Sequence, residues 1–223
     1  MDYALDHVFV CCSVGGTEAE LLTRAGLTEG SPNTHPGQGT SCRRFFFSNA
    51  YLELLWISDS QEASSETSAP TRLLERWRGR AEQSSPFGIA LRPARNAATI
   101  PLPFETWAYA PPYLPPGFTI EMAAATTLTE PEMFFARFAK RPDERLGAAR
   151  EPVTHPLGVS ELSSLKITTK FDVPSSPAAR ALVRHGLVAF SAGEASCLEI
   201  GLDAERKGRE LDLRPRLPLV LRW

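Results

Sequence analysis

The chain has 223 residues, of which 43% are hydrophobic and 22% are charged, so it is long and apolar enough to bury a sizeable core. Its 26 acidic and 24 basic side chains give a formal net charge of −2. This near balance excludes a general nucleic-acid binder and a basic membrane-surface binder. No apolar run approaches the roughly 20 residues that a bilayer-spanning helix needs.

The cysteines and the first residues indicate a cytoplasmic protein. Cys11 and Cys12 are adjacent within an apolar run, and neither they nor Cys42 and Cys197 show C-x-x-C spacing. This distribution is typical of buried, reduced thiols and not of a disulfide framework or a zinc site. The opening sequence MDYALDH is acidic, whereas a secretory signal begins with a basic segment and continues with an apolar one.

The first sixty residues predict a strand, a helix and a hairpin. Thr17, followed three residues later by Glu20, has the spacing of a capping box, and Gly26 is placed to end the helix that follows. The remaining elements expected here are a strand at 5–12, a Pro- and Gly-rich loop at 31–40, and strands at 43–48 and 51–58.

The middle of the chain alternates loops with short elements. Residues 61–69 are rich in Ser and Glu and predict a mobile loop, while 71–80 predict a short amphipathic helix. A further short helix is expected at 131–138, which begins with proline. Strands are expected at 87–92, 106–109 and 118–123. The segment 110–117 contains too many prolines to be a paired strand.

The last seventy residues repeat the element order of the first sixty. A strand at 162–169 precedes a helix that Ser176 caps and Pro177 begins, and Gly186 ends that helix. Strands at 187–190 and 196–202 complete a β-α-β-β order. We therefore divide the chain into a first module (1–60), a linker (61–84), a second β-rich module (85–152) and a C-terminal module (153–223).

Three predicted strands carry a glutamate between large aliphatic residues, namely Glu53, Glu121 and Glu199. Because strand side chains alternate, each carboxylate faces away from its aliphatic neighbours. On a dry face an unpaired carboxylate is costly, and a metal, a substrate or a water-filled cleft removes that cost. His7 lies in an apolar strand in the same way. A hydrogen bond to a neighbour or simple solvation explains such residues equally well.

The motifs resemble a known superfamily. Residues 5–10 (LDHVFV), the capped helix and residues 51–55 (YLELL) resemble the βαβββ module of the vicinal oxygen chelate superfamily, which contains glyoxalase I, bleomycin-resistance proteins and extradiol dioxygenases. The sequences HPGQGT at 35–40 and HPLG at 155–158 resemble its glyoxalase-like domain branch. The resemblance implies an α+β fold in which repeated βαβββ-type modules form curved mixed sheets around an open cup.

The resemblance also implies a metal site. Enzymes of the superfamily hold one divalent metal through a residue on the first and the last strand of each module. Carried over by position, these are His7 and Glu53 in the first module and Glu121 in the second, where Gly88 stands at the remaining position. Such a site suits Fe, Mn, Zn or Ni. It implies a lyase or isomerase that chelates vicinal oxygens of a small molecule, with Glu121 as the base.

Other residues are candidates for substrate contacts. Trp107, Tyr109 and Tyr113 lie in or beside the stiff proline-rich segment and either line a pocket mouth or cover the sheet edge. His35 is either a mobile acid–base group or part of a turn. Arg43 is expected to meet an anionic substrate, although alternation allows only one of Arg43 and its neighbour Arg44 to reach the cup.

Three functions therefore remain open. The first is a metal-dependent glyoxalase-like enzyme, and the second is a metal-free binding protein that sequesters a small molecule, as bleomycin-resistance proteins do. The third is a scaffold whose cup is filled by its own side chains and which acts by oligomerisation. The expected partners are a small-molecule ligand and a second copy of the chain in a homodimer. No nucleic acid or membrane is expected.

Overall fold

The computed structural model describes residues 2–94 and 100–223. One sheet contains β1 (Tyr3–Cys11), β2 (Asn33–His35), β3 (Thr40–Phe46), β4 (Tyr51–Ile57), β5 (Phe87–Pro93), β6 (Thr106–Tyr109), β7 (Ile120–Ala123) and β8 (Glu132–Phe135). The other contains β9 (Leu162–Thr169), β10 (Ala189–Ala192), β11 (Cys197–Leu202), β12 (Glu210–Asp212) and β13 (Leu219–Arg222). The helices are α1 (Ala19–Arg24), α2 (Ser60–Ala63), α3 (Leu73–Gly79) and α4 (Pro177–Arg184). Single 3₁₀ turns lie at η1 (Ala69–Thr71), η2 (Pro142–Glu144), η3 (Gly147–Ala149) and η4 (Asp203–Glu205).

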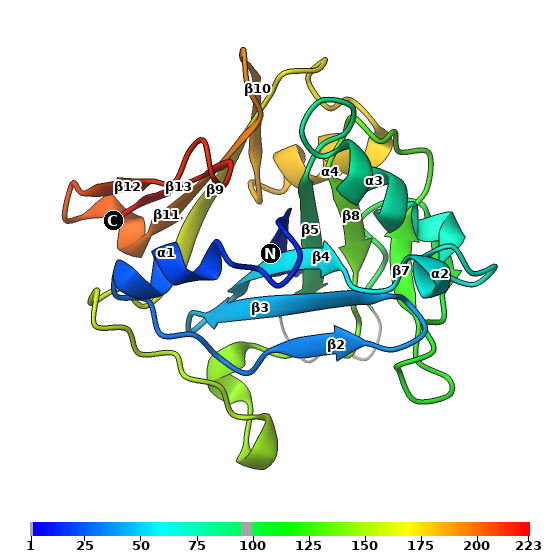
Figure 1. The fold of residues 1–223 in the computed structure, drawn as a ribbon, viewed down its shortest axis with the longest axis horizontal. Helices are drawn as coiled ribbons and strands as arrows, with labels where there is room; N and C mark the ends of the chain where they lie inside the picture. Colours follow the sequence, from blue (N-terminus) through cyan, green and yellow to red (C-terminus); the bar gives the residue numbers. More distant parts are fainter. Residues whose placement is uncertain (1, 95–99) are drawn as a thin grey trace.

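The eight-stranded sheet consists of two halves with the same strand pairing. Its order is β2-β3-β4-β1-β5-β8-β7-β6, with β1 and β5 antiparallel at the centre (Figure 1). In each half the first strand runs parallel to the last, β1 beside β4 and β5 beside β8. This is the α+β arrangement of mixed sheets that the resemblance implied.

The outer face of this sheet packs into the main hydrophobic core. Val8 and Leu52 from the sheet are joined there by Leu22 of α1, Leu182 of α4 and Leu198 of the second sheet, all of them fully buried. Each such side chain contributes about 1.5–3 kcal/mol by leaving water. The outer face is thus closed, and the inner face is left to form a cavity.

A smaller core covers one end of the inner face. Phe9 and Leu55 pack there against Leu73 of α3, and Trp77 of α3 donates a hydrogen bond to the Cys12 carbonyl at 2.8 Å. In Figure 1, α2 and α3 lie on one side of the sheet and the C-terminal sheet (orange and red) on the other. Within the described residues, no helix has the length and apolarity to cross a bilayer.

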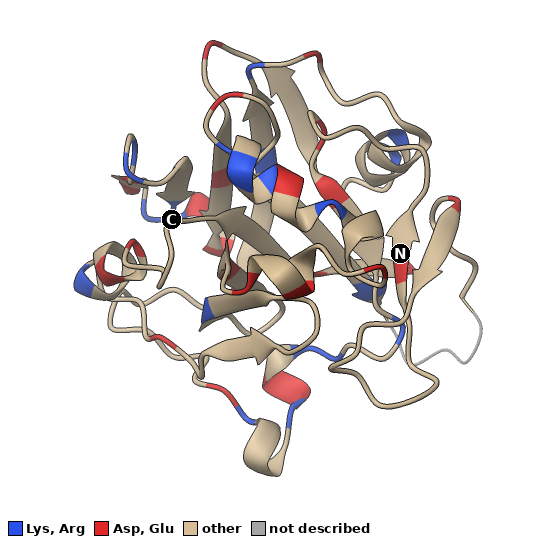
Figure 2. Cartoon of the chain, turned by 45° about the vertical axis from the view of Figure 1, so that its right-hand side comes forward, with Lys and Arg blue, Asp and Glu red and all other residues tan. Residues whose placement is uncertain are grey.

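Charged residues are spread over the molecule. Figure 2 shows basic and acidic positions interspersed along helices and loops, without a side given over to one sign. This distribution agrees with the near-zero net charge.

The structure corrects the helix predicted at 131–138, because these residues contain strand β8. Met133 and Phe135 are buried on the outer face, while Glu132 and Phe134 point inward. The strand pairs with β5 on one side and β7 on the other. Pairing on both edges, with side chains that alternate between the two faces of the sheet, outweighs the helix signal of a leading proline.

The structure only partly agrees with the predictions made for the segments at the starts of α1 and α2. Helix α1 starts at Ala19 and its N-cap makes no side-chain hydrogen bond, so the capping box predicted from Thr17 does not form. Residues 61–69, predicted as a mobile loop, contain most of α2 and the start of η1. Asp59 caps α2 by accepting hydrogen bonds from the N–H groups of the first helical turn.

The C-terminal region has the predicted element order but a different pairing. Ser176 caps α4, accepting a hydrogen bond from the N–H of Ala179 at 3.2 Å, as the sequence predicts. However, the sheet order is β10-β9-β11-β13-β12, so β9 lies between β10 and β11. In the first half β1 pairs instead with β4 and β5. The C-terminal region thus repeats the order of elements of the first sixty residues but not their strand pairing.

Candidate functional site

The inner face of the eight-stranded sheet lines a cavity of about 490 Å³. Its walls come from β1, β2, β3, β4, β7 and β8, from residues near 71–73 and 109–114, and from the segment 136–149 after β8. Every lining residue precedes residue 150. The C-terminal sheet therefore packs outside the cup.

A β-bulge in β1 places two consecutive polar residues in the cavity. The pairing with β5 shifts between Leu5 and His7, so Asp6 is an extra residue in the strand. Asp6 and His7 both line the cavity, which strict alternation forbids and a bulge allows. The Asp6 carboxylate lies 2.7 Å from Nδ1 of His7. This contact fixes the ring and leaves Nε2 directed into the cavity.

The structure places His7 beside Glu53. Nε2 of His7 lies 3.5 Å from Oε2 of Glu53, and the two side chains are 12% and 7% exposed. The parallel pairing of β1 with β4 sets this proximity, because it puts Tyr51 level with His7 and Glu53 two residues further along. The Tyr51 ring stacks on the imidazole with ring centroids 4.4 Å apart.

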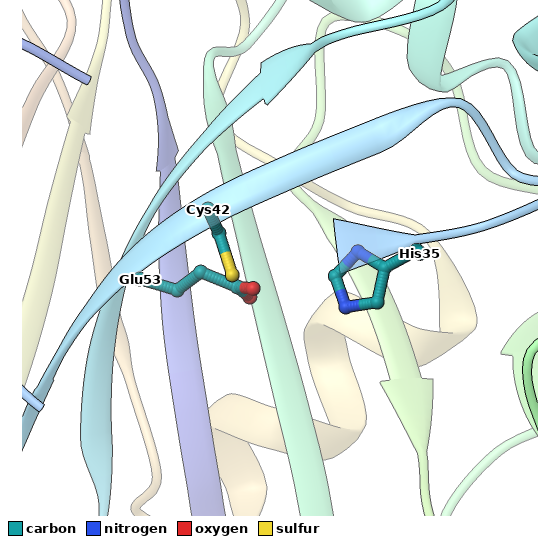
Figure 3. A group of neighbouring side chains, drawn as sticks. All are labelled: His35, Cys42 and Glu53. Carbon is teal, nitrogen blue, oxygen red and sulfur yellow. The ribbon is translucent and has the colours of Figure 1, made fainter. Parts of the chain in front are cut away.

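His35 and Cys42 complete a cluster around Glu53. Their potential ligand atoms and that of Glu53 all lie within 4.8 Å of one another. Figure 3 shows the Cys42 thiol beside the Glu53 carboxylate and the His35 ring facing both. Burial, reinforced by the Glu53 charge, raises the pKa of the Cys42 thiol, so it stays protonated unless a cation binds.

The His35 ring is held by polar neighbours. Nδ1 lies 2.8 Å from the Thr40 hydroxyl and Nε2 lies 2.9 Å from the Asn33 amide nitrogen. Burial lowers the pKa of His35, which favours the neutral imidazole. A neutral ring is the form that binds metals.

The HPGQGT segment is a tight turn that positions His35. Gly39 has φ +74, and a Cβ there would come within 2.1 Å of the Asp59 carbonyl oxygen. The Gly37 N–H donates to the Glu62 carboxylate at 2.7 Å. The glycines thus allow β2 and β3 to reverse close to the start of α2, with His35 facing the cavity.

Glu121 is not brought together with His7 and Glu53. On β7 its neighbours Ile120 and Met122 line the cavity, and Glu121 faces the other way. Its carboxylate accepts hydrogen bonds from the hydroxyls of Thr106 and Thr119 at 3.3 and 3.0 Å. The strand that ends the second half is β8, not β7.

The cavity-facing carboxyl of the second half is Glu132 on β8, which sequence analysis did not single out. It is 6% exposed, and neither carboxylate oxygen has a hydrogen-bond partner in the described chain. The nearest cationic atom is Nε of Arg76 at 3.9 Å. Burial raises the pKa of Glu132 to about 7, with Arg76 opposing the shift. This carboxyl therefore changes charge near neutrality.

Among its described residues, the second half places no metal-binding side chain opposite His7. A Cβ on Gly88 would lie 2.0 Å from the ring of Phe9, which covers this position on β5. Phe134 of β8 contacts the His7 ring edge-on, with centroids 5.5 Å apart. Aromatic rings thus occupy the space from which the second module was expected to supply a ligand.

The predicted aromatic contacts divide into two groups. Tyr109 and Tyr113 line the cavity, and the Tyr113 ring lies 4.8 Å from that of His35. Trp107 lines a separate small pocket of about 40 Å³, which it shares with Arg76 and Glu132. It is outside the main cavity.

The arginine that reaches the cup is Arg44, not Arg43. Arg43 makes two hydrogen bonds of 2.6 Å to the Glu29 carboxylate on the other face of the sheet. Arg44 lines the cavity, pairs with Glu151 at 3.3 Å and donates to the Ser31 carbonyl. Alternation along β3 separates the two side chains, as predicted.

Comparisons with known proteins agree with this architecture. Residues 5–105 match the family model described as a glyoxalase-like domain. The crystal structure of a hypothetical protein from Staphylococcus aureus is similar over 99% of this chain and 98% of that chain, with a TM-score of 0.52 and 11% identity. That likeness shows the fold alone. No curated protein matches the chain.

The fold and the cavity thus define a cup built on two halves of one sheet. Over residues 5–105 the chain matches a glyoxalase-like domain, a type of domain found in the vicinal oxygen chelate superfamily.

Proposed function

We propose that the protein is a metal-dependent enzyme, a lyase or isomerase that acts on a small oxygenated molecule in the cavity. His7 and Glu53 hold the metal, together with His35 or Cys42. The observation that carries this proposal is the 3.5 Å approach of His7 Nε2 to the Glu53 carboxylate inside a nearly buried site.

The donor set fits a divalent cation. With Asp6 accepting the Nδ1 proton of His7, Nε2 carries a lone pair and faces the lone pairs of Glu53. Two acceptors in this position are stabilised by a cation that contacts both. Metal bonds of about 2.0–2.2 Å place two ligand atoms about 3 Å apart, close to the separation observed between these atoms. His35 and Cys42 supply further nitrogen and sulfur donors.

The chain's own residues supply the remaining functions. A bound metal acts as a Lewis acid on substrate oxygens. Glu132, with a pKa of about 7, is suited to accept and return a proton at neutral pH, the role expected earlier of Glu121. Tyr109, Tyr113 and Phe134 surround the substrate with apolar surface and exclude water.

A second candidate is metal-free sequestration of a small molecule. The aromatic rings of Phe9 and Phe134 favour it, because they fill the second half of the expected ligand set. In this case His7 is an imidazolium that pairs with both Asp6 and Glu53.

Metal analysis separates the two candidates. Protein purified without chelators is measured by elemental mass spectrometry, then stripped and titrated with Zn, Mn, Fe and Ni. We expect one metal per chain, lost in His7→Ala and Glu53→Gln. Glu121→Gln is the matched control, since it makes the same change on β7 of the same sheet with the side chain facing away from the cavity, and it should retain the metal. Failure of the wild type to bind any of these metals would overturn the enzyme proposal in favour of sequestration.

A further inference from the structure

The mouth of the cavity carries basic groups that the metal site does not use. The segment 136–149, which follows β8, crosses one end of the cavity and brings Lys140 and Arg145 to its lining. In the described chain, neither side chain has a carboxylate within 4.0 Å, whereas Arg44 is paired with Glu151. The mouth is therefore positively charged without internal compensation.

Arg145 is fixed in place by aromatic rings. Its guanidinium carbon lies 5.4 Å from the ring centroids of both Phe46 and Tyr51. Tyr51 in turn stacks on His7. A guanidinium held over aromatic faces keeps its N–H groups free at its edge, which suits a carboxylate or another planar anion.

Two acidic groups deeper in the cavity, Asp6 and Glu53, lie against His7. Asp6 contacts His7 at 2.7 Å and lies 4.0 Å from Nε of Arg92, and Glu53 faces His7. The cavity thus has a negative interior beside His7 and a positive mouth beside Tyr51. This difference in charge would orient a ligand that has one anionic end, because the anionic end is attracted to Arg145.

Much of the remaining wall of the cavity is apolar. It is formed by Leu114, Ile120, Met122, Phe134 and Phe138. A cavity of about 490 Å³ accommodates a small molecule of drug-like size or less.

We infer that the natural ligand is an organic anion, in which a carboxylate binds Arg145 and Lys140 and an apolar or aromatic body packs along the wall. This inference extends the proposed function by naming its substrate class, but the anion site needs no metal. The rest of the ligand lies next to His7 and Glu53.

The test compares an acid with its own amide. Binding of 3-phenylpropionate and 3-phenylpropanamide, with longer and shorter homologues of each pair, is measured by calorimetry in chelator-treated protein. We expect the acid to bind at least about tenfold more tightly than the amide, the size of one charge-assisted hydrogen bond. The preference should vanish in Arg145→Gln, weaken in Lys140→Gln and be partly kept in Arg145→Lys.

Arg150→Gln is the matched control, because Arg150 is an exposed arginine near the same segment that does not line the cavity. It should leave the preference unchanged. The inference is overturned if no acid binds at millimolar concentration, if acid and amide bind equally, or if Arg150→Gln acts like Arg145→Gln. Binding of the acid is measured in chelator-treated protein without metal. A failure of the metal proposal therefore does not affect this result, and a failure of acid binding does not affect the metal proposal.

Discussion

The two halves of the eight-stranded sheet share one strand pairing and differ in what they present to the cavity. The first half supplies His7, His35 and Glu53 to the lining, with Cys42 buried beside Glu53. At corresponding places the second half supplies aromatic and aliphatic side chains, with Glu132 as its inward carboxyl. The repeated strand pairing thus sets which positions face the cavity, while the residues at those positions differ between the two halves. In the described residues, one half is a polar site and the other is a mainly apolar wall in which Glu132 is the inward carboxyl.

The largest effect is expected at the ion pair behind that wall. Arg76 is 3% exposed, and its guanidinium faces Glu132 and donates to the carbonyls of Ser85, Leu128 and Glu130. Arg76→Met should lower the free energy of unfolding by about 3–5 kcal/mol, since it leaves a buried carboxyl and three carbonyls without their cation. Urea denaturation measures this loss. The double variant Arg76→Met/Glu132→Gln should recover part of it, and no recovery would mean that the pair is not coupled.

The charge of Glu132 makes stability depend on pH. Its pKa is raised from 4.5 to about 7 in the folded protein, so the folded state binds this proton more tightly than the unfolded chain does. Stability should fall as the pH rises between these values, by on the order of 2–3 kcal/mol. Glu132→Gln should flatten the profile across this window, measured by denaturation at fixed ionic strength, whereas Glu121→Gln should not. Equal slopes in wild type and Glu132→Gln would contradict the assignment.

A third prediction concerns Gly88, which stands on β5 where the family resemblance implied a metal-binding side chain. Gly88→Ala pushes a methyl group into the Phe9 ring and should destabilise the protein by about 1–3 kcal/mol. Combining it with Phe9→Ala should cost less than the two single changes added together, because the smaller side chain frees the space. Thermal and urea unfolding of the four proteins give the coupling. Additive losses would show that Phe9 does not exclude a side chain at this position.

The last prediction concerns the contact between Asp6 and the His7 ring. Asp6→Asn keeps the size of the side chain but weakens the contact to Nδ1 that orients the ring. Metal affinity should fall about 10–100-fold, as for loss of a carboxylate behind a histidine ligand. Asp2→Asn, at an exposed residue outside the cavity, serves as the control for the same chemical change. Equal metal affinity in Asp6→Asn and wild type would show that His7 needs no such support.

Much of the fold is predictable from local sequence. The strands at 106–109 and 162–169 coincide with prediction, and the strand at 51–58 differs by one residue. These segments carry dense β-branched, aromatic or aliphatic residues between clear turn signals. The family resemblance, and not alternation within one strand, anticipated that His7 and Glu53 lie together, since alternation only sets each residue against the neighbours on its own strand.

Other features depend on contacts between distant segments. The bulge that turns Asp6 into the cavity is defined only by pairing with β5. The segment PEMFFARF at 131–138 begins with proline and has helix-like spacing, so its pairing with β5 and β7 was missed. As a result, the sequence prediction took β7 instead of β8 as the last strand of the second half, and Glu121 instead of Glu132 as its inward carboxylate. Similarly, the pairing of β3 with β4 puts Arg44 level with Glu53 on the cavity side, which leaves Arg43 on the other face, where it pairs with Glu29.

The most direct test of the central claim is anomalous diffraction from crystals soaked in zinc. The account predicts a single strong peak within bonding distance of His7 Nε2 and the Glu53 carboxylate, and its disappearance in Glu53→Gln crystals. A peak that contacts neither residue, or no peak in the cavity while zinc binds elsewhere, would contradict a metal site built by the first half of the sheet.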